Sequence, residues 1–178
     1  MATKTLLTIE QYEQLPDTGV RTELVDGEVI ELSMGNLLHM FVRDETRAVL
    51  RGLGQGFAGT EAEFRTIDNR VRRADAVWFA PGRLVESDWT RSVLPVPDLV
   101  VEVVSPNDLA AEVRAKVREY LEAGVTTVWI IYLESREADI WNRGRGISAV
   151  NDNLTADCLP GVTIQLERIF PQTLSGTT

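Results

Sequence analysis

The feature that most restricts how this chain can fold is a β-branched run, followed by a helical segment and a second apolar run. Residues 99–104 read Leu-Val-Val-Glu-Val-Val, and residues 126–133 read Thr-Thr-Val-Trp-Ile-Ile-Tyr-Leu. A helix is predicted between them over about 108–123, because residues 105–108 (Ser-Pro-Asn-Asp) suit its start and Gly124 suits its end. This order forms a right-handed crossover between two parallel strands. The second run is apolar on both faces, which is typical of a central strand.

The rest of the sequence predicts antiparallel neighbours for this unit. Two short runs flank the turn dipeptide Asp26-Gly27 and predict a hairpin over residues 21–33. Asn36 can cap a helix over residues 36–50. The other predicted elements are a short helix over 8–14, an antiparallel pair over 57–68 and 71–80, and weaker strands over 138–142 and 161–166. We therefore predict an α/β fold in one domain, residues 1–178, with a mixed sheet, flanking helices and an N-terminal hairpin.

Composition limits the classes of protein that this chain can represent. With 44% hydrophobic and 25% charged residues, it matches a soluble globular protein with one core. The net charge of −9 gives no long-range attraction to phosphate and argues against a constitutive nucleic-acid binder, although bound divalent cations can override it. The lone Cys158 excludes an internal disulfide and a Cys-rich zinc site. No stretch resembles a signal peptide or a membrane span, so we expect a cytoplasmic protein without membrane partners.

Two carboxylates occupy positions where strand periodicity expects apolar side chains. Glu102 shares a predicted strand face with Val100 and Val104. Asp75, in the run 71–79, is predicted to share a face with Val71, Arg73, Val77 and Phe79. An isolated carboxylate in such a place costs several kcal/mol, so it must be protonated, paired or bound to a cation.

Lys116 is the third misplaced polar group. Leu109, Val113, Lys116 and Tyr120 follow the register of a core-facing helical stripe. Because this helix follows directly on the strand of Glu102, it can bring Lys116 towards that carboxylate. A buried structural ion pair explains this arrangement as well as a catalytic site does, and Lys116 can also extend its stem to the surface.

A second inward carboxylate favours a catalytic site, because one lysine cannot neutralise both Asp75 and Glu102. Two acids and an amine at one sheet edge are typical of a divalent-metal phosphodiesterase. The acids hold a hard cation such as Mg²⁺, which lowers the pKa of the attacking water and binds a phosphate oxygen. The ammonium group orients the water or stabilises charge that builds on the phosphorus centre.

Several motifs occur together in a fixed order along the chain. They are 23–28 (Glu-Leu-Val-Asp-Gly-Glu), His39, 73–75 (Arg-Ala-Asp), 97–106, Lys116, 120–125 and Val128-Trp129. In these motifs, from residue 8 to about 170, the chain resembles the Uma-type endonuclease family within the PD-(D/E)XK restriction-endonuclease-like superfamily. Two departures from the superfamily pattern are Ala74, where proline usually precedes the first acid, and Val104, where lysine usually follows Glu102. Lys116 on the next helix matches a lysine that has moved there in this family.

The resemblance implies a restriction-endonuclease-like core and a metal-dependent endonuclease that hydrolyses phosphodiester bonds. It implies that Asp75 and Glu102 bind Mg²⁺ or Mn²⁺ and that Lys116 is a base-like catalytic residue. It also places His39 and Glu23 at the site, Glu23 as an extra acidic ligand or orienting group and His39 as a phosphate or water contact. Without the resemblance, His39 fits an ordinary helix residue and Glu23 a half-exposed hairpin residue.

The arginines offer two further interpretations. Arg65, Arg70, Arg72 and Arg73 lie in or beside the strand of Asp75 and can either grip phosphates or pair with surface acids.

Two functions follow from the sequence. The leading hypothesis is a Mg²⁺- or Mn²⁺-dependent endonuclease with a nucleic acid substrate, most simply DNA. The alternative is a non-catalytic dimeric interaction module that retains the fold. A homodimer is expected in both cases, because apolar strands here lack obvious edge protection.

Overall fold

The computed structural model describes residues 6–33, 35–105 and 108–172. Their strands form a nine-stranded mixed sheet with the main order β2-β1-β4-β6-β7-β8-β9, while β3 pairs with β4 and with β5. The bounds are β1 (Thr22–Val25), β2 (Glu28–Glu31), β3 (Phe57–Arg65), β4 (Val71–Phe79), β5 (Val93–Leu94), β6 (Leu99–Val104), β7 (Thr127–Tyr132), β8 (Glu137–Asn142) and β9 (Gly146–Val150). A separate two-stranded sheet contains β10 (Asn153–Leu154) and β11 (Ile164–Gln165).

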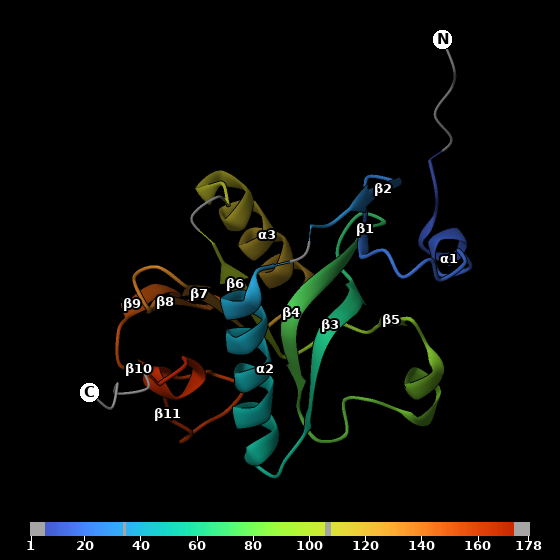
Figure 1. Cartoon of the computed structure of the whole chain (residues 1–178). Coiled ribbons are helices and arrows are strands. Elements are labelled where there is room, and N and C mark those ends of the chain that lie inside the picture. The colour runs from blue at the N-terminus through green and yellow to red at the C-terminus, as the bar shows by residue number, and fades with distance from the viewer. Residues whose placement is uncertain (1–5, 34, 106–107, 173–178) are drawn as a thin grey trace.

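Helices cover both faces of the large sheet (Figure 1). On one face α2 (Leu37–Gly52) packs through Val42 and Leu50 against a core that includes Trp78 and Trp129. On the other face α3 (Ala110–Ala123) packs through Val117 and Tyr120 against strand residues of β3, β4, β6 and β7. The short elements are α1 (Ile9–Tyr12), η1 (Glu86–Thr90) and η2 (Leu166–Ile169).

The predicted mixed α/β sheet with helices on both faces and an N-terminal hairpin is confirmed. Strands β6 and β7 are parallel, and α3 is the crossover between them. The hairpin turns at Asp26-Gly27, where Gly27 has a φ of 81° and an added Cβ would lie 2.8 Å from the Leu6 side chain.

Several boundaries differ from the prediction. The first helix has only four residues, the strand expected over 161–166 shortens to β11, and the sequence did not indicate β9. The predicted helix start at Pro106 and Asn107 lies outside the described residues. Among the residues that are described, no helix is both long enough and apolar enough to cross a membrane.

Strand β4 is where the sheet opens. One of its edges pairs with β3 along nearly its whole length. The other pairs with β1 only at Val71, and with β6 only from Ala76 to Trp78. Residues 72–75 therefore lie between two strands that separate from each other. Backbone amides left without a ladder partner at such a place need another acceptor.

Candidate active site

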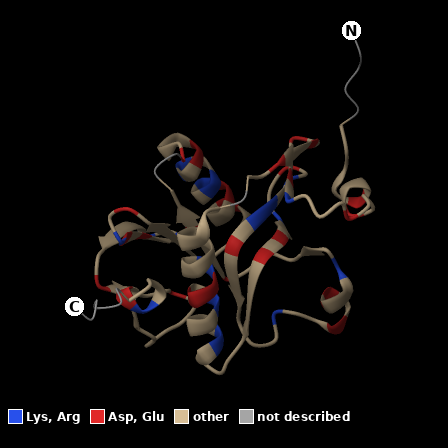
Figure 2. Ribbon diagram, in the orientation of Figure 1, with Lys and Arg blue, Asp and Glu red and all other residues tan. Residues whose placement is uncertain are grey.

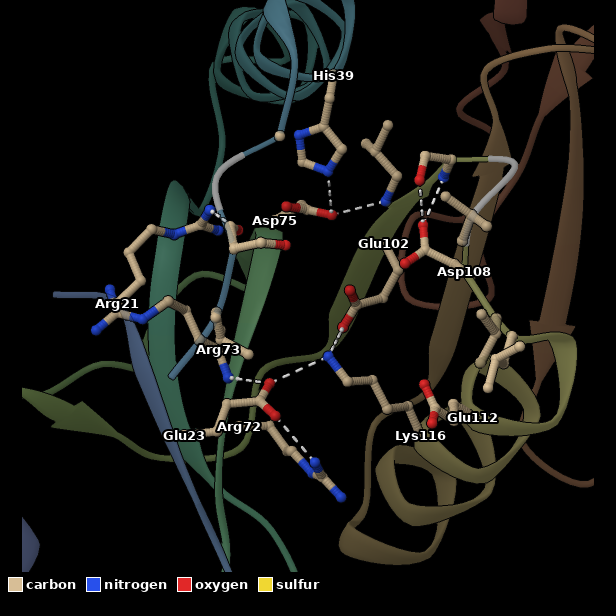
Figure 3. Close-up of a pocket in the computed structure, with 18 of the residues that line it drawn as sticks. Arg21, Glu23, His39, Arg72, Arg73, Asp75, Glu102, Asp108, Glu112 and Lys116 are labelled. Atoms are coloured by element: carbon tan, nitrogen blue, oxygen red, sulfur yellow. Dashed lines mark hydrogen bonds and ion pairs between the residues drawn. The ribbon is translucent and has the colours of Figure 1, made fainter. Parts of the chain in front are cut away.

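A cleft of about 890 Å³ occupies the opening beside β4 (Figure 3). It lies between the β1–β2 hairpin and the start of α2 on one side, and the end of β6 with α3 on the other. The five residues singled out in the sequence all line it: Glu23, His39, Asp75, Glu102 and Lys116. The fold therefore brings together residues that are up to 93 positions apart in the chain.

Asp75 lies at the point where β4 and β6 part. The backbone N–H of Val103 donates to its Oδ2 at 2.8 Å, so the carboxylate replaces a missing ladder bond. Nε2 of His39 lies 3.3 Å from the same oxygen. Among the described residues no group hydrogen-bonds to Oδ1. Because Oδ1 is not among the described buried polar atoms that lack a partner, it retains some solvent-accessible surface.

His39 stands in the first turn of α2, which the side chain of Asn36 caps by accepting the His39 N–H at 2.9 Å. The hydrogen bond with Asp75 raises the pKa of His39 and outweighs burial, which acts to lower it. Gly35 makes room for the ring, because a Cβ there would lie 2.5 Å from Nδ1. His39 is therefore placed to orient Asp75, and the phosphate or water contact that the resemblance implies stays a prediction.

Glu102 lies on the α3 side of β6, on the face shared with Val100, as predicted. The hydroxyl of Tyr120 donates to its Oε1 at 2.5 Å. Burial raises the pKa of Glu102 to about 7, opposed by the charge of Lys116 and reinforced by that of Asp75. Its Oε2 accepts no hydrogen bond from the described residues and retains some solvent-accessible surface.

Lys116 points into the cleft and contacts two carboxylates. Its Nζ lies 3.1 Å from Oε1 of Glu23 and 3.8 Å from Oε1 of Glu102. Burial acts to lower the pKa of Lys116, but the two carboxylates outweigh it, so the pKa lies above its usual range. The amine is therefore protonated at neutral pH.

Glu23 is buried, with both of its oxygens in use. Its Oε1 accepts from Lys116 and from the backbone N–H of Arg73, and its Oε2 accepts from Arg72 at 2.9 Å. It closes the opening on the β1 side as Asp75 does on the β6 side. Glu23 is thus placed as an orienting group for Lys116, one of the two roles that the resemblance implies, and its role as an extra acidic ligand stays a prediction.

The arginines near the site are paired with acids. Arg72 forks onto Glu119 of α3 at 2.9 and 2.7 Å while it also contacts Glu23. Its neighbours pair as Arg65 with Glu10 and Glu13, Arg70 with Asp26 and Glu119, and Arg73 with Glu63. Figure 2 accordingly shows a basic segment of β4 beside acidic segments of β3. Of the two interpretations of these arginines, the structure therefore supports pairing with acids and not free cations that grip phosphates.

Tyr120 and Glu119 do not line the cleft but contact residues that do, Glu102 and Arg72, and the sequence did not indicate either contact. Tyr120 reads as one more apolar position of the α3 stripe, and only its hydroxyl could have indicated a buried partner. No hydrophobic periodicity marks Glu119, and its main partner, Arg72, is far away in the chain. The sequence therefore carries no sign of this contact.

The donor set suits a hard divalent cation. Asp75 and Glu102 each present one open carboxylate oxygen to the cleft, while their other oxygens are held in place. Within the described part of the chain, no group of three or more His, Cys, Asp or Glu side chains is arranged to hold a metal. Two protein ligands are enough for Mg²⁺, which usually keeps several waters and is completed by substrate phosphate. The residues present therefore fit such an ion.

A mixed sheet with helices on both faces and an acidic cleft where two of its strands separate has the architecture of a restriction-endonuclease-like α/β protein. The chain belongs to the Uma2 family, described as "Putative restriction endonuclease", whose model matches residues 9–175. This confirms the resemblance seen in the sequence.

A solved structure supports the fold. The chain is similar to a putative nuclease belonging to DUF820 from Anabaena variabilis, with 16% identity and a TM-score of 0.78. The match covers 92% of this chain and 97% of that one. No curated protein matches the chain. At this identity the likeness concerns the fold, so the site rests on the geometry of this chain.

Proposed function

We propose that this protein is a Mg²⁺- or Mn²⁺-dependent endonuclease that hydrolyses phosphodiester bonds in DNA. The observation that carries the proposal is the pair of open oxygens, Oδ1 of Asp75 and Oε2 of Glu102, in one cleft with the ammonium group of Lys116. DNA is the substrate we favour because the family description names restriction endonucleases.

Asp75 and Glu102 would hold the metal ion. Such an ion lowers the pKa of a bound water and offsets phosphate charge. Without a cation, burial raises the pKa of the Glu102 carboxyl group to about 7, and the charge of Asp75 reinforces this shift. A cation beside these two groups relieves that repulsion.

The other polar groups hold charges and orientations. Because its pKa lies above the usual range, Lys116 keeps its proton and serves as a cation that orients water or stabilises developing negative charge. This favours the cation role over the base-like role implied by the family resemblance. Glu23 fixes the amine at 3.1 Å, and His39 fixes the Asp75 carboxylate.

The proposal is tested by calorimetric titration with Mn²⁺ and by incubating single- and double-stranded DNA with Mn²⁺ or with EDTA. We expect metal binding to the wild type and cleavage only when metal is present. Asp75→Asn keeps the shape of the side chain but removes its charge, and should bind Mn²⁺ at least roughly tenfold more weakly, about 1.4 kcal/mol. Glu112→Gln is the matched control, because Glu112 lines the same cleft and is exposed. Its affinity should equal that of the wild type. Metal-dependent cleavage that survives Asp75→Asn would contradict the ligand role.

The non-catalytic dimeric module is a second candidate, and strand β9 favours it. This strand is an outer edge of the sheet (Figure 1), and its five residues carry no charge. Ile147 on it is 50% exposed. Such edges pair readily with another strand, here that of a second copy. Light scattering should then give a dimer mass that Ile147→Lys reduces to a monomer. Absence of Mn²⁺ binding at millimolar metal, together with a dimer, would favour this module over the nuclease.

A further inference from the structure

On strands β3 and β4, side chains alternate between the two faces of the sheet, and this alternation reverses at one pair of facing residues, Glu61 and Asp75. On β4, Val77 and Phe79 pack in the core under α3, while Ala76 and Trp78 pack in the core under α2. Beyond the pair the order is reversed, since Ala74 packs under α3. The same inversion occurs on β3, where Ala58 lies under α2 but Phe64 lies under α3. The prediction that Asp75 shares one face with Val71, Arg73, Val77 and Phe79 is therefore wrong.

The inversion is centred on Glu61 and Asp75, which stand opposite each other. The register pairs Thr60 with Ala76 and Ala62 with Ala74, but no pairing joins Glu61 to Asp75. No residue is inserted in either strand, so this is not a bulge. Glu61 has a φ of 54°, a left-handed conformation that is rare for a residue with a long side chain inside a strand.

Three arginines hold Glu61 in this conformation. Its carboxylate contacts Arg21 at 2.5 Å and Arg43 of α2 at 2.6 Å. Its backbone carbonyl accepts from Nη1 of Arg73 at 3.1 Å. Backbone strain persists only where the surroundings determine it strongly, and it is concentrated at functional sites. The arginines meet that condition, since Arg21 lies just before β1, Arg43 is in α2 and Arg73 is in β4 itself.

The inversion has two consequences for the cleft. Asp75 is directed to the Val103 N–H and His39, not into the apolar core with Val77. Arg72 lies two residues before Ala74 and therefore on the same face of β4, where its side chain reaches Glu119 of α3. In an uninterrupted strand, Asp75 would follow Val77 into the core under α3.

We propose that Glu61 is a positioning residue for Asp75, and that its left-handed backbone turns β4 so that Asp75 faces the cleft. This inference rests on the proposed function only in the metal-binding role of Asp75. It predicts that the backbone conformation at residue 61 matters more than the carboxylate there.

Three variants separate these effects. Glu61→Gly loses the carboxylate but adopts positive φ freely. Glu61→Val disfavours positive φ because of its branched Cβ. Glu61→Ala is a milder backbone change that serves if the valine variant does not fold. His39 is the only histidine of the chain, so the proton signal of its Nε2–H reports whether the ring still faces Asp75, because this proton is protected from exchange and shifted downfield only while it is held by an acceptor. This spectrum needs neither metal nor activity.

We expect Glu61→Gly to keep the protected downfield Nε2–H signal and to bind Mn²⁺ within roughly threefold of wild type. Glu61→Val should lose that signal and bind Mn²⁺ roughly 10–100-fold more weakly, as for other groups that orient metal ligands. Glu61→Ala should lie between them. Equal losses in the glycine and valine variants, or a folded valine or alanine variant with an unchanged imidazole spectrum, would overturn the proposal. Absence of Mn²⁺ binding in the wild type would overturn the proposed function but leave the imidazole test of Glu61 intact.

Discussion

Replacing Lys116 by Met is expected to reduce the rate of metal-dependent DNA cleavage by roughly 10²–10³-fold, the usual cost of removing one group that stabilises developing charge. The methionine keeps most of the side-chain volume and removes only the ammonium group. That group is the cation lying within 4 Å of both Glu23 and Glu102, and its raised pKa keeps it charged at neutral pH. The measurement is a single-turnover cleavage rate at saturating Mn²⁺ and DNA.

A matched control comes from the same helix. Arg118 lies two residues further along α3 and is exposed to solvent, so Arg118→Met removes a positive charge from α3 outside the cleft. The cleavage rate of this variant should stay within about threefold of wild type, since exposed charges act weakly through screening salt. If Lys116→Met also stays within that range while Mn²⁺ is still bound, the amine has no role in the chemical step.

The sequence was sufficient to find Glu102 and Lys116 because both break a local periodicity. A carboxylate between valines and a lysine in an apolar helical stripe can be recognised without knowing the fold. Their encounter also follows from local order, since α3 comes directly after β6 and must pack back onto the sheet. Short-range sequence rules were therefore enough to identify these two residues as candidates.

Asp75 was found for a reason that the structure corrects. Strict alternation placed it with Val77 and Phe79, but the left-handed backbone of Glu61 inverts the alternation at that pair. Glu61 has this conformation because of arginines from other elements, so no rule based on neighbouring residues could predict it. Glu23 was similarly ambiguous, because its burial depends on Arg72 and Lys116, which are 49 and 93 residues away.

Arg72 is expected to be the arginine of this region that matters most for stability. Replacing it by Met should lower the free energy of unfolding by about 3 kcal/mol, the lower end of the range for breaking a buried ion pair. The side chains of Glu23 and Glu119 are 3% and 4% exposed, so losing Arg72 leaves buried charge poorly compensated. Lys116 and Arg70 still contact these two acids, which is why the lower end applies. Urea denaturation measures the change.

Arg65→Met is the control for this effect, because Arg65 is 35% exposed and its partners Glu10 and Glu13 are 66% and 21% exposed. Its loss should cost about 0–1 kcal/mol, as is usual for surface pairs. Equal costs for the two arginines would show that the pairing of Arg72 with Glu23 and Glu119 adds no stability beyond that of an exposed pair.

The pH dependence of the Arg72→Met effect separates charge from packing. Burial acts to raise the pKa of Glu119, but hydrogen bonds from Arg72 and Thr66 outweigh it, so the pKa lies below its ordinary value of 4.5. A carboxyl group with a lowered folded-state pKa stabilises the protein above the ordinary value, and this contribution is lost as pH falls towards the folded-state pKa. Without Arg72 the pKa of Glu119 is lowered less, so this carboxyl group contributes less stability above its ordinary pKa. The stability difference between wild type and variant should therefore be largest near neutral pH and should narrow as the pH falls below about 4.5. A difference that stays constant over this range would mean that Arg72 stabilises the fold through the packing of its stem and not through its charge.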